Sequence, residues 1–567
     1  MITRVALALA MIFQPVPAPP PLEATTCPVA VPRGTKCGFL VVPERRDAPG
    51  RTIKVGYAVS PSIARGRKPD PIVYTSGGPG SSSIQLTGFL RQMFPDRDVI
   101  ALEQRGSRYS QPSLGCPETV KAMLDQLRTP RGDIGAAATA CRTRLEEQGV
   151  DLRGYRTAEI AADVVALRQA LGYPSWNLFG VSYSTRSMLE AAAADPTGVR
   201  SVVLDSFLPE SVSWYGDAAA NFTATLDKLG VRDRFEVMAR RLNSRPAFVE
   251  TTDPQLGTRF KATLTGDDVA TILAEGLHDP QVSAVAPALI DALADGHYEL
   301  LQPLADAVGG GLTSHEFGLY HAVQCQDERP TAKSTLFTVN ADKAVCDAWN
   351  LPASPPVNAT TQAPVLVLGG EFDPTTPTRT SRPAAELLPH ARFVELPGLS
   401  HAVFLSSQCA RQTIIAFVGD TSSVSAPCGP VYRRFSPSDL VVSQAPYQAQ
   451  TSPWLLAPFA LFALVSIVQF VVGAMRGRAL TAFGGLAGTA FCGLVVQEVW
   501  RLAGENEVAL AVGLPASVGW IQWLAVGSDV LTLAALVKAA GKIRLWPFAV
   551  AAVVADGFLV WWWTWVL

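Results

Sequence analysis

The sequence predicts an α/β fold with a mostly parallel sheet and helices on both faces, followed by four transmembrane helices. Between Phe39 and Leu396, short apolar runs alternate with amphipathic helical segments, which is typical of parallel strands joined by helical crossovers. From Trp454 onward the chain is almost entirely apolar. With 567 residues, the chain is long enough for more than one folded unit.

The first segment, residues 1–26, is expected to be a signal peptide followed by a proline-rich stretch. Arg4 precedes the apolar run Val5–Phe13, and a proline cluster follows at Pro15–Pro21. This apolar run is too short to cross a bilayer, and the pattern is typical of a secretory signal. We therefore expect the protein to be exported.

Cysteine usage agrees with export. The chain has nine cysteines, and one of them, Cys492, lies inside the apolar C-terminal part. An even number in an exported domain indicates disulfide bonds. The candidates are Cys27, Cys37, Cys116, Cys141, Cys325, Cys346, Cys409 and Cys428. In chain order they form four short-range pairs, although other pairings are equally compatible with the count. The Cys and His spacings are not those of metal sites, so we expect no metal and no cofactor.

The exported part is predicted to hold one core in two parts, residues 27–210 and 351–432. The expected strands are Phe39–Val42, Ile53–Val59, Ile72–Tyr74, Val99–Leu102, Trp176–Phe179, Val199–Leu204, Val365–Leu368 and Phe393–Leu396. A long interval separates the strands Val199–Leu204 and Val365–Leu368. Its main part, residues 211–350, has mostly helical patterns and is too long for a connection. We interpret it as an inserted helical cap.

The segment around Ser182 predicts a strand, a sharp turn and then a helix. It reads Gly180-Val-Ser182-Tyr-Ser184, and a helical pattern follows at Thr185–Ala194. Such a turn lifts a serine hydroxyl out of the sheet at the start of a helix, where it can act as a nucleophile. Ser184 stands where this G-x-S-x-G motif has its second glycine. Ser182 is the candidate nucleophile.

The charge that forms on a substrate carbonyl during serine attack needs backbone N–H donors. One candidate is Tyr183, directly after the nucleophile. The second is Gly78, in the loop Ser76-Gly-Gly-Pro-Gly80 that follows an expected strand. Pro79 has no N–H to offer. Gly78 and Tyr183 are therefore the predicted oxyanion donors.

A general base and an acid are expected at the ends of later strands, in the order Ser, Asp or Glu, His. Among the six histidines, His401 alone follows an expected core strand at its carboxyl end. Asp205 and Asp373 both follow a strand, and Asp373 directly precedes the segment that carries the histidine. We favour Asp373 as the acid that orients His401 and interpret Asp205 as a structural hydrogen-bonding residue.

The C-terminal part, residues 454–567, is predicted to form four transmembrane helices after a linker at 433–453. The four apolar stretches are Trp454–Met475, Leu480–Trp500, Val512–Val537 and Trp546–Val566. The loops after the first and third stretches carry the positive charges Arg476, Arg478, Lys538, Lys542 and Arg544. The positive-inside rule places these loops in the cytoplasm and everything before Trp454 outside. Asp556 inside the fourth stretch is interpreted as a helix-packing residue, with a transport pathway as the alternative.

Residues 37–428 resemble the prolyl/tripeptidyl aminopeptidase family of α/β hydrolases. The matching segments are Gly77-Gly-Pro-Gly80, Glu103-Gln-Arg-Gly-Ser107, Gly180-Val-Ser-Tyr183 and Asp373-Pro-Thr-Thr-Pro377. The resemblance implies the α/β-hydrolase fold, cleavage near the free N-terminus of a peptide, and cap carboxylates that hold the substrate ammonium. In this chain those carboxylates would be Asp327 and Glu328; a solvated acidic pair is the alternative. Glu103 and Arg105 are expected to brace loops around the site.

Three functional hypotheses remain at the level of sequence. The leading one is a membrane-anchored peptidase that acts on peptides with a free N-terminus through an acyl-enzyme, and the lipid bilayer is its second partner. An esterase or lipase on the same scaffold is the second, because fold and triad do not determine the acyl group. An inactive hydrolase-like receptor is the third. With a net charge of −2 and no basic run, nucleic-acid binding is not expected.

Overall fold

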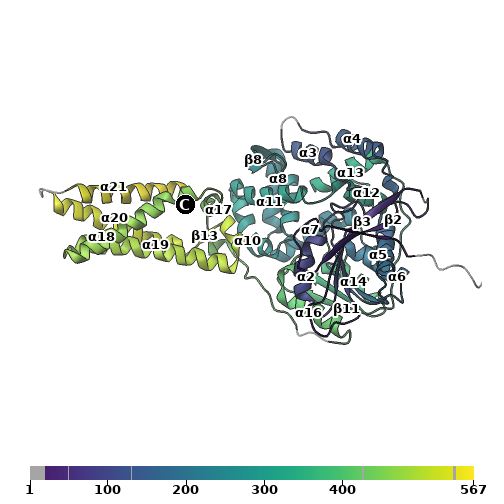
Figure 1. Ribbon diagram of the computed structural model, residues 1–567. Coiled ribbons are helices and arrows are strands. Elements are labelled where there is room, and N and C mark those ends of the chain that lie inside the picture. Colours follow the sequence, from purple (N-terminus) through teal and green to yellow (C-terminus); the bar gives the residue numbers. More distant parts are fainter. Residues whose placement is uncertain (1–18, 49, 129–130, 424–426, 541–544) are drawn as a thin grey trace, which may run out of the picture.

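The computed structural model describes residues 19–48, 50–128, 131–423, 427–540 and 545–567. Figure 1 shows an α/β body from which a bundle of long helices projects. The expected signal-peptide core lies outside the described residues. The segment Leu22–Thr25, which belongs to the expected signal and proline-rich stretch, forms the edge strand β1 of the main sheet.

The body is built on a sheet of nine strands in the order β1-β2-β3-β5-β4-β6-β7-β10-β11. From β5 through β11 the neighbours are parallel, while β1, β2 and β3 form antiparallel pairs, and β3 also pairs antiparallel with β5. All eight expected strands are present, and the mostly parallel sheet is confirmed. The strands after β1 are β2 (Lys36–Pro43), β3 (Thr52–Ser60), β4 (Ile72–Thr75), β5 (Val99–Leu102), β6 (Trp176–Val181), β7 (Val199–Asp205), β10 (Val365–Gly370) and β11 (Ala391–Leu396).

Helices cover both faces of the sheet, because alternate strand residues point to opposite sides. In β4, Val73 belongs to one apolar core and its neighbours Ile72 and Tyr74 belong to the other. The core helices are α2 (Thr87–Met93), α3 (Pro117–Asp125), α4 (Ile134–Glu147), α5 (Thr157–Leu171), α6 (Ser184–Ala194), α14 (Thr378–Glu386), α15 (Val403–Ser406) and α16 (Gln408–Gly419), with the short turns η1 (Ile84–Leu86) and η2 (Leu152–Gly154).

The region between β7 and β10 is the expected helical insertion, and most of its helices pack around an apolar core that is separate from those beside the sheet. It also contains a two-stranded antiparallel hairpin, β8 (Ala247–Thr252) with β9 (Arg259–Leu264), which the sequence analysis does not anticipate. Its helices are α7 (Trp214–Leu229), α8 (Arg232–Ser244), α9 (Gly266–Gly276), α10 (Pro280–Asp295), η3 (Tyr298–Leu300), α11 (Leu301–Leu312), α12 (Phe317–Asp327) and α13 (Phe337–Trp349).

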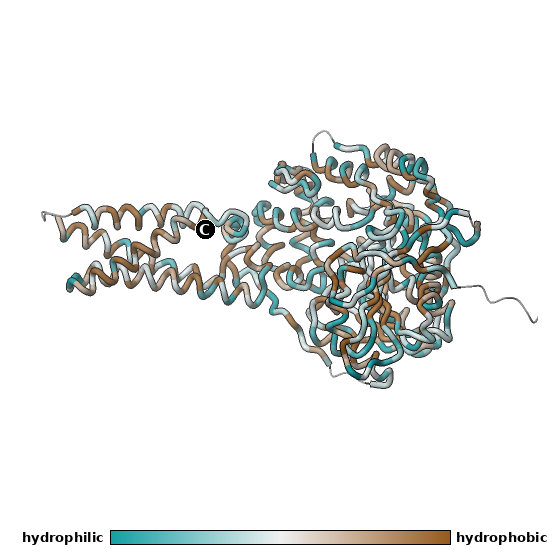
Figure 2. The backbone as a smooth tube through the Cα atoms, in the orientation of Figure 1, coloured by the Kyte–Doolittle hydropathy of each residue, from teal (hydrophilic) through white to brown (hydrophobic). Residues whose placement is uncertain are grey.

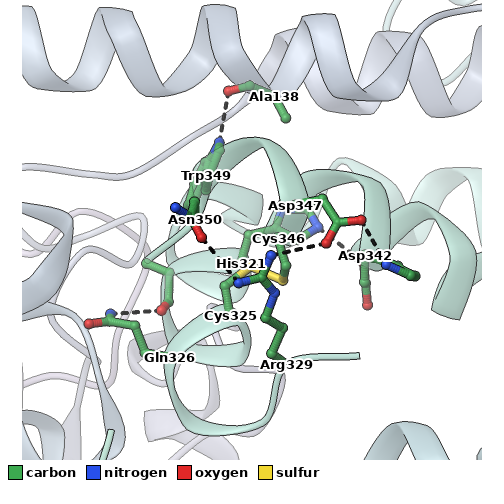
Figure 3. The surroundings of a disulfide bond; sticks show 12 residues. Ala138, His321, Cys325, Gln326, Arg329, Asp342, Cys346, Asp347, Trp349 and Asn350 are labelled. Atoms are coloured by element: carbon green, nitrogen blue, oxygen red, sulfur yellow. Dashed lines mark hydrogen bonds and ion pairs between the residues drawn. A yellow bond between two sulfur atoms is a disulfide. The ribbon is translucent and has the colours of Figure 1, made fainter. Parts of the chain in front are cut away.

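Four disulfides join cysteines in chain order: Cys27–Cys37, Cys116–Cys141, Cys325–Cys346 and Cys409–Cys428. The bond between Cys325 and Cys346 ties α12 to α13 (Figure 3). In the same region the indole N–H of Trp349 donates to the carbonyl of Ala138 at 2.7 Å. This part of the cap is therefore fixed to α4 of the core.

Four long apolar helices form the C-terminal bundle: α18 (Ala457–Met475), α19 (Ala479–Glu505), α20 (Val518–Ala539) and α21 (Trp546–Trp561), the last continued by η7 (Trp562–Val566). Each is long and apolar enough to cross a membrane. Figure 2 shows apolar residues along the whole bundle, and large side chains such as Leu464 and Val496 are exposed on it. The third helix begins at Val518 rather than near Val512, because residues 513–515 form strand β13.

The segment 433–453, expected to be a linker, is instead ordered and packed between the cap and the helical bundle. It contains η4 (Pro437–Asp439), β12 (Leu440–Val442), α17 (Ala445–Thr451) and the start of η5 (Pro453–Leu456). Strand β12 pairs antiparallel with β13 (Gly513–Pro515), which follows η6 (Glu507–Ala511) between the second and third long helices. A Ser- and Gln-rich composition gave no sign of this pairing, because the partner strand lies far away in the sequence.

The cap and the bundle share contacts. Leu440, Leu502 and Leu510 belong to the same apolar core as the cap helices. The amide of Asn506 donates to the carbonyl of Gln281 at 2.9 Å, and the Tyr447 hydroxyl donates to Asp306 at 2.7 Å. The bundle therefore docks on the cap through both apolar and polar groups.

Candidate active site

Ser182 lies at the sharp turn between β6 and α6. Its φ is +55°, a left-handed conformation that is uncommon for a residue with a side chain and costs on the order of 1–3 kcal/mol. The backbone N–H of Ser182 donates to the carbonyl of Asp205 at 2.9 Å, which holds the turn against β7. A Cβ at Gly180 would lie 2.8 Å from the carbonyl oxygen of Ser184, so this turn needs glycine there.

Ser184, the residue that departs from the G-x-S-x-G pattern, is buried, and its hydroxyl both accepts and donates hydrogen bonds. Its hydroxyl accepts from the Val181 N–H at 2.8 Å and lies 2.8 Å from the carbonyl of Thr75, to which it donates. The serine therefore binds two neighbouring strands together where the motif's glycine would only give room.

Asp373 and His401 follow neighbouring strands, β10 and β11. The Nδ1 atom of His401 lies 2.8 Å from an oxygen of Asp373, whose side chain is fully buried. The N–H groups of Thr375 and Thr376 donate to the other Asp373 oxygen, each at 2.9 Å. Nε2 of His401 has no hydrogen-bond partner among the described residues, and the His401 side chain lines the cavity that contains Ser182.

The charges of the pair support each other. Burial disfavours the Asp373 carboxylate, but the His401 charge and hydrogen bond, with the Thr376 N–H, hold its pKa well below the ordinary value. Burial likewise opposes the His401 imidazolium, but the charge and hydrogen bond of Asp373 outweigh it and raise the His401 pKa. The pair is thus arranged to stabilise a protonated imidazole, the form a base takes after accepting a proton.

Asp205, the alternative acid, has a different set of partners. Its carboxylate accepts from the N–H groups of Val403 and Phe404 at 3.1 and 2.8 Å. Burial raises its pKa to about 6 despite these bonds. It fixes the first turn of α15, directly after His401, and it acts on the imidazole only through its charge, which adds to the rise in the His401 pKa.

The loop 76–80 lies against Ser182. A Cβ at Gly77 would lie 2.9 Å from the Cβ of Ser182, so only glycine allows this approach. The backbone N–H groups of Gly78 and Tyr183 have no hydrogen-bond partner within the described part of the chain, and Gly78 lines the same cavity as Ser182. Both are free to donate to a substrate oxygen.

The segment Glu103-Gln-Arg105 braces this loop. An oxygen of Glu103 accepts from the Ser82 hydroxyl and from the N–H groups of Ser83 and Ile84, each at 2.9 Å. Gln104, whose role the sequence analysis missed, accepts from the Gly80 N–H at 2.9 Å and donates to the Ser76 carbonyl at 2.7 Å.

Arg105 lies behind this loop, where its guanidinium pairs with Asp163 at 2.7 Å and donates to the carbonyls of Glu44 and Gly154. Arg105 therefore attaches the segment Glu103–Arg105 to α5 and to the end of β2. That segment in turn holds the glycine loop rigidly.

A second histidine, His278, reaches the site from the turn between α9 and α10 of the cap. Its ring packs against the ring of His401 with centroids 4.7 Å apart, and its Nε2 lies 2.6 Å from the hydroxyl of Thr375. Burial and the nearby His401 lower its pKa, against the opposing charge of Glu275. The sequence placed His278 only in the cap, and no local pattern connects it with the strand ends.

The site opens into a cavity of about 1040 Å³ lined by Ser182, Gly78 and His401 together with cap residues. This volume is at the upper end of the ~300–1,000 Å³ that is usual for small-molecule sites. Most of the lining is apolar, with Glu275 and Asp342 among its few carboxylates. The Asp342 carboxylate is already bound by Tyr215, Tyr320 and His321.

Asp327 and Glu328, the expected amine anchors, do not line this cavity. Their carboxylates are bound by other residues of the chain. Asp327 accepts from the N–H and hydroxyl of Thr157, at 2.9 and 2.5 Å. Glu328 pairs with Arg186 at 3.0 Å.

The two carboxylates lie near Glu190 of α6 and form an acidic cluster with it. Burial, with the charges of Glu210 and Asp327, raises the pKa of Glu190 in α6 to about 8. This cluster connects α12 to α6 rather than facing the cavity.

Comparison with known proteins agrees with the fold. Residues 70–264 match the model of the alpha/beta hydrolase fold, and residues 334–424 match that of TAP-like proteins. The chain is 26% identical to the serine protease Hip1 of Mycobacterium tuberculosis over 488 residues, which cover 72% of this chain and 91% of that protein.

Two further relatives carry the names of other hydrolases. A protein of M. tuberculosis named carboxylesterase B is 25% identical, covering 70% of this chain and 87% of the relative. The tripeptidyl aminopeptidase of Streptomyces lividans is 24% identical, covering 70% and 84%. The chain has the α/β-hydrolase fold with a TAP-like segment at residues 334–424, and it is a serine hydrolase.

Proposed function

We propose that this chain is an exported, membrane-anchored serine peptidase that releases short peptides or residues from free N-termini. The observation that carries the proposal is that Ser182 and His401 line one cavity and that Asp373, buried behind it, binds His401. The three residues come from the ends of three separate strands. Ser182 is the nucleophile, His401 the base and Asp373 the acid that orients it. Relatives named as a serine protease and a tripeptidyl aminopeptidase support the peptidase assignment.

The reaction follows the acyl-enzyme route. His401 Nε2 takes the proton of Ser182 as Oγ bonds to the substrate carbonyl carbon, and Asp373 stabilises the imidazolium that forms. The N–H groups of Gly78 and Tyr183 bind the oxyanion. His401 then gives its proton to the leaving amine as the C–N bond breaks, and a water molecule hydrolyses the ester in a second cycle of the same steps.

The structure records no hydrogen bond between Ser182 Oγ and His401 Nε2 in the described residues. Catalytic hydrogen bonds of this kind are often long in unliganded enzymes and tighten when substrate binds. The shared cavity and the free Nε2 support the assignment of roles.

A peptidase that needs a free N-terminus requires a carboxylate in the cavity to bind the ammonium. Because Asp327 and Glu328 are engaged elsewhere, Glu275 is the better candidate: it lines the cavity, is exposed to it, and lies 3.5 Å from Nδ1 of His278. Glu275→Gln is then expected to raise KM for free-amine peptides and to leave the hydrolysis of simple esters unchanged.

Ester hydrolysis is the second candidate function. The mostly apolar cavity and the relative named carboxylesterase B favour it. The same three residues and the same oxyanion donors would carry that reaction.

We further propose that the catalytic part lies outside the cytoplasm. In this arrangement the export segment lies within 1–26, of which Leu22–Thr25 remain in the sheet as β1. Residues 27–210 and 351–432 form the core, 211–350 the cap, 433–453 the connection and 454–567 the membrane part. Arg476, Arg478 and Lys538 lie at the bundle ends away from the body, which supports a cytoplasmic position for those ends. Four disulfides in the body support an oxidising compartment.

The test uses the full-length protein in lipid nanodiscs with three substrates: tripeptide anilides with a free N-terminus, their N-acetylated forms, and an aryl acetate. Cleavage of the free peptides alone, abolished in Ser182→Ala, supports the peptidase. Cleavage of the ester alone would transfer the assignment to the esterase. If Ser182→Ala retains wild-type rates, the proposed nucleophile is wrong.

A further inference from the structure

The cavity that contains Ser182 is lined by all three parts of the protein. Its core side carries Ser182 and His401, and its middle is lined by α11 of the cap, including Leu304 and Val308. The opposite side is formed by the membrane part and the segment that leads to it. The lining residues there are Tyr447, Gln450, Glu507, Val508, Ala511 and Val512.

The far side of the cavity lies next to the end of a helix that is long and apolar enough to cross a membrane. Residue Glu507, where η6 begins, is two positions after Glu505, the last residue of the spanning helix α19. Exposed tryptophans surround the bundle at this same end: Trp454, Trp500, Trp520 and Trp563. Tryptophan gathers at the boundary between lipid headgroups and hydrocarbon.

Two side chains from η6, Val508 and Ala511, form an apolar wall of the cavity, and Glu507 adds a carboxylate beside it. Val508 and Ala511 are three residues apart in a 3-10 helix, so they lie on one face of it. Both are half-buried and line the cavity. The polar contact between Tyr447 and Asp306 holds α17 against α11 beside this wall.

We propose that this membrane-side half of the cavity binds a long alkyl chain, so that the enzyme acts on substrates anchored in the bilayer by such a chain. The proposal rests on the assignment of Ser182 as the nucleophile. An apolar wall at the headgroup level gains binding energy from each buried methylene, whereas a short soluble peptide would leave it unused. The hydrolysable bond, an ester or an amide, lies at the Ser182 end.

The first experiment measures covalent labelling of the full-length protein in nanodiscs by two alkyl fluorophosphonates, one with an ethyl and one with a dodecyl chain. In this reaction Ser182 Oγ bonds to phosphorus, the P–F bond breaks, fluoride leaves, and the serine proton passes to His401. The labelling rate with the dodecyl reagent is expected to exceed that with the ethyl reagent by on the order of 100-fold.

Two substitutions fill the membrane-side half, Val508→Trp and Ala511→Trp. Each is expected to lower the dodecyl-to-ethyl ratio about tenfold. The ratio is taken within one preparation, so a partly folded variant does not distort it. The matched control is Val496→Trp on the lipid-facing side of α19, where the side chain is 57% exposed and the ratio should not change.

The outcomes are distinct. If neither reagent labels the protein, or if Ser182→Ala is labelled as fast as the wild type, Ser182 is not the nucleophile. The proposed alkyl-chain site, which rests on that assignment, is then also wrong. If both reagents label Ser182 and the tryptophan variants keep the wild-type ratio, the chain site is overturned and the nucleophile stands.

The origin of the chain is assigned with two substrate pairs. One pair is a free-amine tripeptide amide of methylamine and of dodecylamine, and the other is p-nitrophenyl acetate and dodecanoate. A long-chain preference that is lost in Val508→Trp, seen in the peptide pair alone, assigns a lipid-modified peptide; in the ester pair alone, it assigns a lipid ester. A preference in neither pair overturns the proposal.

Discussion

Single residues at this site are held by contacts from several elements at once. Ser182 has a positive φ, and the carbonyl of Asp205 on the next strand binds its N–H. His401 is fixed on one side by Asp373 and on the other by the ring of His278. The chemistry proposed for the site therefore depends on several contacts, and the loss of one of them is expected to displace a reacting side chain.

The pH dependence of activity should report on His401. The base must be neutral to accept a proton, and the pairing with Asp373 raises its pKa above the ordinary ~6.5. We expect kcat/KM to increase with pH along a limb whose midpoint lies above ~6.5, because protonated His401 is inactive below it. A pH–rate profile on a substrate that does not titrate in this range measures it, and a midpoint below pH 6 would contradict the assignment.

His278 is expected to position His401. The substitution His278→Ala removes the ring packing and the contact with Thr375, so His401 gains freedom to rotate. We expect kcat to fall about tenfold, the cost of a barrier increase of ~1.4 kcal/mol, with KM nearly unchanged. The matched control is His297→Ala, an exposed cap histidine whose only recorded side-chain partner in the described residues is Glu299. A rise in KM with unchanged kcat would assign His278 to substrate binding instead.

At the scale of elements, the sharp turn between β6 and α6 sets the geometry of the nucleophile. Ser184 satisfies the N–H of Val181 and the carbonyl of Thr75, both buried, and so joins β6 to β4. The glycine loop after β4 is held in turn by Glu103 and Gln104 after β5. Three adjacent strand ends thus behave as one rigid unit.

The substitution Ser184→Ala should destabilise this unit. It leaves a buried N–H and a buried carbonyl without their partner, and each such loss costs about 1–3 kcal/mol. Chemical unfolding of the full-length protein in detergent measures the change. Ser187→Ala on the same helix is the matched control, because its hydroxyl binds only the carbonyl of Ser184, and it should cost under ~1 kcal/mol. Equal effects of the two substitutions would argue against a special role for Ser184.

At the scale of the whole molecule, the helical bundle and the cap are packed together and share one apolar core. The cap core continues into residues of the membrane part, among them Leu502, Leu510 and Val512, and hydrogen bonds from Gln444 and Asn506 cross the same boundary. Figure 1 shows α10 and α11 facing the bundle. The cavity reaches this boundary, so residues of the helical bundle contribute to the lining of the proposed substrate site.

Removal of the membrane part should therefore weaken the cap. A chain ending at Tyr432 loses Phe435, Leu440 and Leu510 from the cap core and exposes its apolar face. We expect a fall in Tm of several degrees and increased binding of a hydrophobic dye, since each buried large apolar side chain contributes about 1.5–3 kcal/mol. A chain ending at Ser452 is the comparison, as it keeps the first two residues and should be intermediate. An unchanged Tm for the shorter chain would show that the cap folds independently.

The sequence by itself determined the core strands, the helical insertion, the four long apolar helices and the candidates Ser182, Asp373 and His401. These features depend on local patterns: apolar runs of strand length, helical periodicity, and glycines and polar residues directly after strands. Because the carboxyl ends of parallel strands lie at one edge of a sheet, the order of the strands was enough to bring the three candidates together.

Only the tertiary structure decided how distant segments meet. Three contacts join residues that no local pattern relates. They are the ring packing between His278 and His401, the pairing of β12 with β13, and the hydrogen bond from Thr157 to Asp327. The cavity wall at Val508 and Ala511 depends on the docking of the helical bundle against the cap. Such contacts arise from the packing of whole surfaces, and a single sequence records the composition of those surfaces but not which of them meet.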